Sequence, residues 1–108
     1  MRTMGWGAES TVLVQTNEKH QMRVNDLHAQ IERVHHEGKR VLAVVGSSCT
    51  TSAGAYDPLE DLAAACRQHG IWFHVDGAHG ASAAFSDAHR HLVKGIEHAD
   101  SVVLDFHK

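Results

Sequence analysis

The sequence of 108 residues has little of several features whose abundance would assign a protein to a class. It contains 2 cysteines, Cys49 and Cys66, whose spacing indicates neither a disulfide framework nor a metal site. Lys and Arg number 10 against 13 Asp and Glu, so no basic field is available for nucleic acid or an anionic membrane. No apolar run approaches the roughly 18 residues of a membrane span, and residues 1–7 lack a signal peptide's apolar core. We expect a reduced, cytoplasmic protein that binds neither nucleic acid nor membrane.

Enough apolar material is present for one small domain. Hydrophobic residues make up 43% of the chain, which argues against disorder. A chain of this size can bury roughly two-thirds of its unfolded surface. Most of the 11 histidines stand in polar helical stretches, where a solvated helix face is the simplest interpretation.

Apolar runs and helical periodicities alternate along the chain. Short runs rich in β-branched residues predict strands over residues 10–16, 40–48 and 71–76, and a fourth strand together with its exit over residues 101–108. Apolar spacing of three and four predicts helices over residues 25–39, 58–70 and 86–100. Asn25 or Asp26 is the expected N-cap of the first helix, Pro58 suits the first position of the second, and Gly70 its end. Alternating strands and helices with short links predict an α/β fold with a mostly parallel sheet and flanking helices.

Three loops are predicted to converge at the carboxyl edge of this sheet, where ligands bind in such folds: residues 47–56, 76–82 and 105–108. Asp76 directly follows an apolar strand and precedes a run of small residues, which lets a flat ligand approach the backbone. Lys108 follows the next strand. Taken alone, Asp76 indicates no more than a helix cap, and Lys108 no more than a solvated lysine.

A lysine and a carboxylate on neighbouring strand ends suit one particular cofactor. Lysine is costly to place near a core unless its amine has a task, and a partly desolvated lysine forms Schiff bases with carbonyl compounds. Pyridoxal phosphate needs such a lysine and an acidic partner for its ring nitrogen. Asp76 and Lys108 are the candidates for that pair.

The segment "GAYDPLEDLAAACRQHGIWFHVDGAHGASAAFSDAHRHLVKGIEHADSVVLDFHK" resembles the pyridoxal-phosphate-dependent group II amino-acid decarboxylases. That family includes the glutamate, cysteine-sulfinate, diaminobutyrate and aromatic-amino-acid enzymes. "HVDGAHG", "HRHLVKGIEHADSVV" and "DFHK" occur in the family's order and at family-like separations. The resemblance runs from about Gly5 to Lys108, which is nearly the whole chain.

The resemblance implies a role for six residues around pyridoxal phosphate. Lys108 matches the catalytic lysine that holds the cofactor as a Schiff base, and Asp76 the residue paired with the pyridine nitrogen. The other four match a residue packed on the ring face, a loop threonine near the cofactor, the histidine beside the lysine, and a position near the phosphate: Ala78, Thr51, His107 and Asp105, respectively. Three positions depart from the family pattern: Gly77 where Ala is common, His79 for Tyr or Trp, and Cys49 for Gly.

The resemblance also implies that residues 1–108 are a single partial domain, truncated at both ends. They correspond to the central segment of the large domain of a fold-type I, aspartate aminotransferase-like enzyme, which is expected to be a homodimer. The implied reaction is decarboxylation of an L-amino acid to the amine and CO₂, and the segment alone is expected to be inactive. Which amino acid is the substrate does not follow from these residues.

Other readings remain. Another fold-type I enzyme, such as a cysteine desulfurase or aminotransferase, also places Asp on one strand and His-Lys on a later one. A metal-dependent hydrolase is possible through His74, Asp76 and His79, because strand alternation sends the first two to one face. A non-catalytic interaction module is a third alternative.

Overall fold

The computed structural model describes residues 2–107, which form an α/β unit around a parallel sheet. The strands, in the spatial order β1-β2-β3, are β1 (Ala43–Ser47), β2 (Trp72–Asp76) and β3 (Ser101–Val103). Ser47 is in register with Asp76, and Asp76 with Val103, so the three carboxyl ends meet at one edge. The predicted fold class is confirmed, as are three of the four predicted strands, each shorter than expected.

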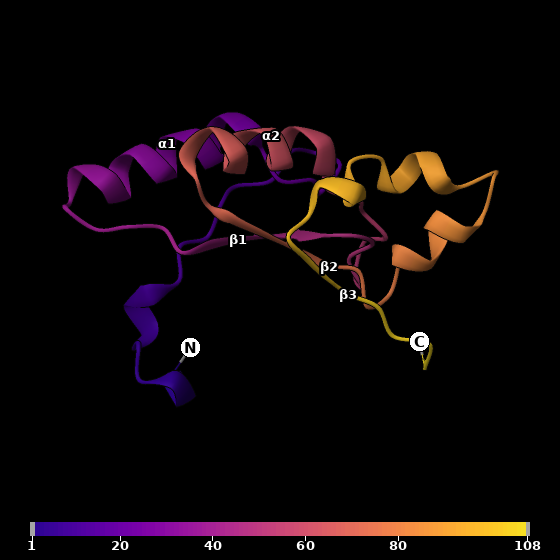
Figure 1. The fold of residues 1–108 in the computed structure, drawn as a ribbon, viewed down its shortest axis with the longest axis horizontal. Helices are drawn as coiled ribbons and strands as arrows, with labels where there is room; N and C mark the ends of the chain where they lie inside the picture. Colours follow the sequence, from indigo (N-terminus) through magenta and orange to yellow (C-terminus); the bar gives the residue numbers. More distant parts are fainter. Residues whose placement is uncertain (1, 108) are drawn as a thin grey trace.

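Two α-helices, α1 (Val24–His36) and α2 (Leu59–His69), lie together on one face of this sheet (Figure 1). Each presents an apolar stripe to the strands, as in α1, where Leu27, Ile31 and Val34 are buried. Helix α2 ends as predicted at Gly70, whose left-handed φ of 65° brings its N–H to carbonyls of the last turn. Both helices confirm the prediction to within a few residues.

The hydrophobic core lies between these helices and the strands. Val44, Phe73 and Val75 point from β1 and β2 toward the helices, and Phe73 and Val75 are almost completely buried. The opposite face of the sheet is not covered by residues 2–107: Val45 and Trp72 are each 53% exposed. Because parallel sheets are normally covered on both faces, this open face is one that further polypeptide would cover.

The strand predicted over residues 10–16 is wrong. Within residues 2–107 this segment has no neighbouring strand, and its single ladder contact is an isolated bridge between Thr16 and Met22. Leu13 is 85% exposed. A β-branched run becomes a strand only where a neighbouring strand pairs with it, and no strand among the described residues does so, although Val14 packs against the core.

The helix predicted over residues 86–100 is also wrong. The chain there forms short 3₁₀ turns, η4 (Arg90–Val93) and η5 (Ile96–His98), after an earlier one, η3 (Ala81–Phe85). Gly95 separates η4 from η5 with a φ of 95°, which a helix cannot accommodate. It adopts this conformation where its backbone touches the first turn of α2, since a Cβ there would lie 2.3 Å from the Glu60 nitrogen.

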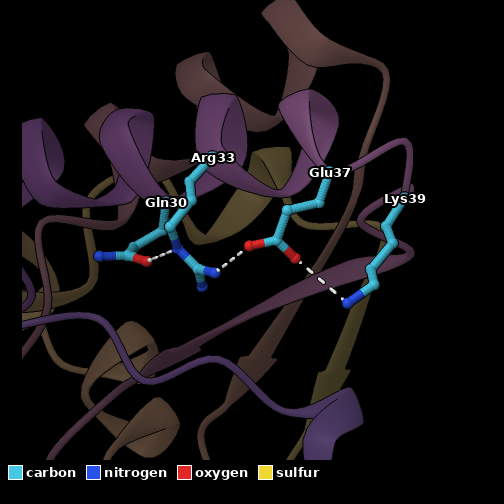
Figure 2. Close-up of polar contacts among 4 residues, drawn as sticks. All are labelled: Gln30, Arg33, Glu37 and Lys39. Carbon is cyan, nitrogen blue, oxygen red and sulfur yellow. Dashed lines mark hydrogen bonds and ion pairs between the residues drawn. The ribbon is translucent and has the colours of Figure 1, made fainter.

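The two ends of α1 are held by different polar contacts. The predicted N-cap is wrong, because Arg23 occupies that position and the Asp26 carboxylate instead accepts the Gln15 N–H at 2.8 Å. At the other end, Figure 2 shows an exposed chain of polar contacts running through Gln30, Arg33, Glu37 and Lys39. Lys39, followed by Arg33, lowers the pKa of the Glu37 carboxyl. Exposed pairs of this kind add little stability.

Candidate functional site

A hollow of about 250 Å³ opens at the carboxyl ends of β1 and β2. Its walls come from the two loops that follow these strands, and they carry hydroxyl, thiol, imidazole and carboxylate groups. The lining residues are Ser47, Cys49, Thr50, Thr51, Asp76, Ala78 and His79. Three residues that the sequence places around a cofactor, Thr51, Asp76 and Ala78, are therefore brought together in one hollow.

The loops that follow β1 and β2 are joined by backbone hydrogen bonds and pack closely against each other. The Ser48 N–H donates to the Asp76 carbonyl at 2.8 Å, and the Gly80 N–H donates to the Ser48 carbonyl at 3.1 Å. A Cβ on Gly80 would lie 2.3 Å from the Cys49 Cβ, a separation that side chains never adopt. Only glycine lets the loops close on each other here, so Gly80 sets the width of the hollow.

Close packing also requires a glycine at position 77. A Cβ at this position would lie 2.3 Å from the Ala81 Cβ and 3.0 Å from the Val103 carbonyl oxygen. The Gly77 N–H itself donates to that carbonyl at 3.1 Å. The departure from the family's Ala at this position thus accompanies tight packing between the Asp76 loop and the end of β3.

The loop after β1 is a compact turn in which Thr50 and Thr51 have different surroundings. The Thr50 Oγ1 accepts the Ala55 N–H at 3.1 Å, and the backbones of the two residues also pair. Thr50 therefore stabilises the loop, whereas the Thr51 side chain is exposed at the rim of the hollow.

Cys49, in the same loop, adopts a φ of 69°, which is uncommon for a residue with a side chain. Burial, together with the adjacent Cys49 thiol, raises the pKa of the Tyr56 hydroxyl.

Asp76 offers an anionic group to the hollow. Its Oδ1 accepts the Ala78 N–H at 3.2 Å, which orients the carboxylate beside the small side chain of Ala78. Asp76 is exposed, and no ion pair within residues 2–107 involves it. A carboxylate in this state can accept a hydrogen bond from a cationic N–H of a ligand.

A buried carboxylate, Asp57, anchors the floor of the first loop. Its Oδ1 accepts the Met22 N–H at 2.7 Å and its Oδ2 accepts the Ser47 N–H at 2.8 Å. The Asp57 N–H donates in turn to the Ser47 carbonyl at 2.9 Å. Asp57 therefore connects the end of β1 to the segment that precedes α1. From the sequence, no functional role was predicted for Asp57, which directly precedes the helix expected over residues 58–70.

Of the remaining predicted residues, two lie away from this hollow and one lies outside the described part of the chain. Asp105 is half-buried beyond β3, and its Oδ1 accepts the His107 N–H at 2.8 Å. Neither Asp105 nor His107 lines the hollow. Lys108, the predicted catalytic lysine, lies outside the described residues.

The arrangement does not support the metal-site alternative. Within residues 2–107, no group of three or more His, Cys, Asp or Glu side chains is placed to hold a metal ion. His74 Nδ1 lies instead 2.8 Å from the Ser101 Oγ on β3, while His79 lines the hollow. None of the helices in the described part of the chain is long and apolar enough to span a bilayer.

A larger hollow of about 340 Å³ lies at the other end of the sheet, where β2 begins. Residues from the end of α2 and the start of β2 line it, including Cys66, Arg67 and Trp72. It contains none of the loops that follow the strands. The smaller hollow is therefore the better candidate site. Two of its lining residues, Ser47 and Thr50, were not predicted from the sequence as site residues, although both belong to the predicted loop over residues 47–56 that contains Thr51.

Comparison with known proteins identifies the family of this chain. The model of the pyridoxal-dependent decarboxylase conserved domain matches residues 5–108. Cysteine sulfinic acid decarboxylase from Mus musculus is 44% identical over 105 residues, which cover 97% of this chain and 21% of that protein. L-2,4-Diaminobutyrate decarboxylase from Acinetobacter baumannii is 41% identical over 108 residues, which cover 100% of this chain and 21% of that protein.

Solved structures of related proteins share the fold of this chain. The crystal structure of mouse CSAD in its apo form superposes with a TM-score of 0.97 at 43% identity, covering 99% of this chain and 23% of that one. The chain thus spans about a fifth of the length of its relatives, 21% for both proteins above. With a family model matched over nearly all its residues and a fold shared almost completely, this chain belongs to the pyridoxal-dependent decarboxylase family.

Proposed function

We propose that this chain is the central, cofactor-binding segment of a longer enzyme that converts an L-amino acid into the corresponding amine and CO₂. One observation carries the proposal: Asp76 stands exposed in the hollow, with no cationic partner among residues 2–107, in a chain that belongs to the pyridoxal-dependent decarboxylases. The relatives named above act on amino acids with an acidic or a basic side chain. They support an amino-acid substrate without choosing between the two.

Three residues of the hollow offer groups that suit the ring of pyridoxal phosphate. Asp76 would accept the N–H of a protonated pyridine ring, and Ala78 would lie against the ring, where a larger side chain would obstruct it. The Thr51 hydroxyl is exposed at the rim, free to bond to a polar substituent. Lys108, which follows the end of β3 in sequence, would hold the cofactor covalently, with His107 and Asp105 beside it.

When bound, pyridoxal phosphate supplies an electron-withdrawing ring that takes up the electron pair left as the α-carboxylate departs as CO₂. The role of Asp76 is to keep a proton on the ring nitrogen, because a carboxylate anion stabilises a cationic N–H donor. Gly80 keeps the two loops close enough to fix the position of Ala78 relative to Asp76. Lys108 would be the residue that holds the cofactor, and its amine would be the group that a substrate amine replaces.

The proposal also covers the length, cellular location and oligomeric state of the whole enzyme. The open face of the sheet, with Val45 and Trp72 each 53% exposed, supports a longer polypeptide that covers it. The free thiols of Cys49 and Cys66 are compatible with a reducing, cytoplasmic location. We also propose a homodimer, which light scattering of the full-length protein tests directly.

Labelling of Lys108 tests the proposed function. The full-length protein is mixed with pyridoxal phosphate, its visible spectrum recorded, and the bound cofactor fixed with borohydride before peptide mapping. We expect a visible band and a label on Lys108, both absent from Lys108→Arg, which keeps the charge but cannot form the Schiff base. Lys94→Arg is the matched control, because Lys94 is an exposed lysine paired with Glu60. A label on another lysine, or no band in the unmodified protein, contradicts the proposal.

A further inference from the structure

Two histidine side chains join α1 to α2, and neither of them lines the candidate hollow. The His28 Nδ1 of α1 lies 3.3 Å from the His69 Nε2 of α2, and the centroids of the two rings are 5.5 Å apart. The rings therefore face each other through their nitrogens instead of stacking. The two residues are 41 positions apart in the chain, so they meet only because α1 and α2 lie side by side (Figure 1).

Helical periodicity places His28 at the edge of the contact between the two helices. His28 directly follows the buried Leu27, whose side chain belongs to the apolar stripe of α1. His28 and His69 are both half-buried, so they pack against the protein on one side and remain accessible to solvent on the other. An ion from solution can therefore reach the two facing nitrogens.

The distance between the two nitrogens suits a shared metal ion. Hydrogen bonds donated by N–H groups are usually about 2.7–3.2 Å long, so 3.3 Å is long for such a bond. Two nitrogens that bind one tetrahedral Zn²⁺ at about 2.0–2.1 Å lie about 3.3–3.4 Å from each other. Adjacent ligands of an octahedral ion at about 2.1 Å are only about 3.0 Å apart. The observed separation therefore favours a tetrahedral ion.

We propose that His28 and His69 form a binding site for one zinc ion, which links α1 to α2. Imidazole is a good ligand for Zn²⁺, and each ring can carry its hydrogen on the outer nitrogen, which leaves a lone pair on the inner one. Among residues 2–107 no third His, Cys, Asp or Glu is placed to join them, so water would complete the tetrahedron. With only two protein ligands, the site would exchange its ion with solution.

Zinc titration by calorimetry on the full-length, cofactor-free protein tests the site. We expect His28→Ala and His69→Ala each to weaken binding of this ion at least about tenfold, because each removes one of two ligands. The double variant should lose little more, because both residues hold the same ion. His69→Gln keeps a polar side chain of similar length and should lose zinc as fully as His69→Ala.

His35→Ala is the matched control. The His35 ring also lies near His69, at 6.1 Å between centroids, but His35 is exposed and no hydrogen bond of the described residues joins the two. Its replacement should leave zinc binding unchanged. A loss in His35→Ala as large as in His28→Ala contradicts the assignment of the two ligands.

The unfolding midpoint separates zinc binding from loss of the contact between the two histidines. An ion that binds only the folded protein stabilises it by mass action, so zinc should raise the midpoint of the unmodified protein. It should raise the midpoint much less in His28→Ala and His69→Ala, whose midpoints without zinc show that they are folded. Equal zinc affinity in these variants and the unmodified protein, or no binding by the unmodified protein at millimolar zinc, overturns the proposal.

Discussion

Replacement of Asp57 by alanine should loosen the base of the candidate site. The change removes the acceptor of two partly buried backbone donors, the Met22 and Ser47 N–H groups, which lie 2.7 and 2.8 Å from the carboxylate oxygens. Asp57 is 8% exposed, so water cannot readily replace the carboxylate. Hydrogen bonds to charged groups contribute about 1.5–3 kcal/mol each, so losing both should cost about 3–6 kcal/mol. Asp57→Asn keeps one acceptor oxygen and should cost about half as much.

Hydrogen exchange in the full-length protein measures this cost where it arises. With every 1.4 kcal/mol equal to a factor of ten, the amides of Met22 and Ser47 should exchange at least about 100-fold faster in Asp57→Ala. Because Ser47 lines the hollow, cofactor affinity should fall as well. Asp87→Asn is the control, since its side chain is 95% exposed and should change stability by less than about 0.5 kcal/mol. If both amides keep their protection in Asp57→Ala, the anchoring role is refuted.

Two further predictions concern a glycine and a thiol. Gly95→Ala should lower the free energy of unfolding in urea by about 3–5 kcal/mol, because its φ is 95° and the new Cβ would lie 2.3 Å from the Glu60 nitrogen. Gly54→Ala is the control: its φ is 63° and the space around it is open, so it should lower the free energy of unfolding by only about 1–2 kcal/mol. Equal losses in the two variants would refute the steric argument. Burial, followed by the charge of Asp100, raises the pKa of Cys66 to about 11, so Cys66 should react with iodoacetamide far more slowly than Cys49. Because the folded-state pKa is raised, the stability that Cys66 contributes is complete below its unfolded pKa of about 8.5 and is lost as pH rises toward 11. A pH series of unfolding midpoints with flat values over that window contradicts the prediction.

The exposed face of the sheet determines which form of the protein is suitable for these experiments. Residues 2–107 leave Val45 and Trp72 exposed, and a parallel sheet covered on one face only is a poor independent unit. Stability measurements are therefore best made on the full-length protein.

Local signals in the sequence were sufficient for the elements that position the site. Strand β2 is an apolar run that ends in Asp76, and Gly70 marks the end of α2 because only a left-handed residue terminates the helix there. The gathering of Thr51, Asp76 and Ala78 was also predictable, since the carboxyl ends of adjacent parallel strands meet at one edge. These features depend on residues close together in sequence or on a general rule of topology.

Other features were decided only by tertiary contacts. Residues 10–16 carry strand composition but find no neighbouring strand among residues 2–107, and residues 86–100 carry a helical pattern that Gly95 breaks where it touches α2. The anchoring role of Asp57 depends on Met22, which lies 35 residues earlier in the chain. The contact between His74 Nδ1 and the Ser101 Oγ joins residues that are 27 apart in the chain. The sequence by itself determined the strand ends, the helix ends and the chemistry they carry, because these are local. The fold decided which distant donors and acceptors meet, because a one-dimensional pattern does not contain the register between strands.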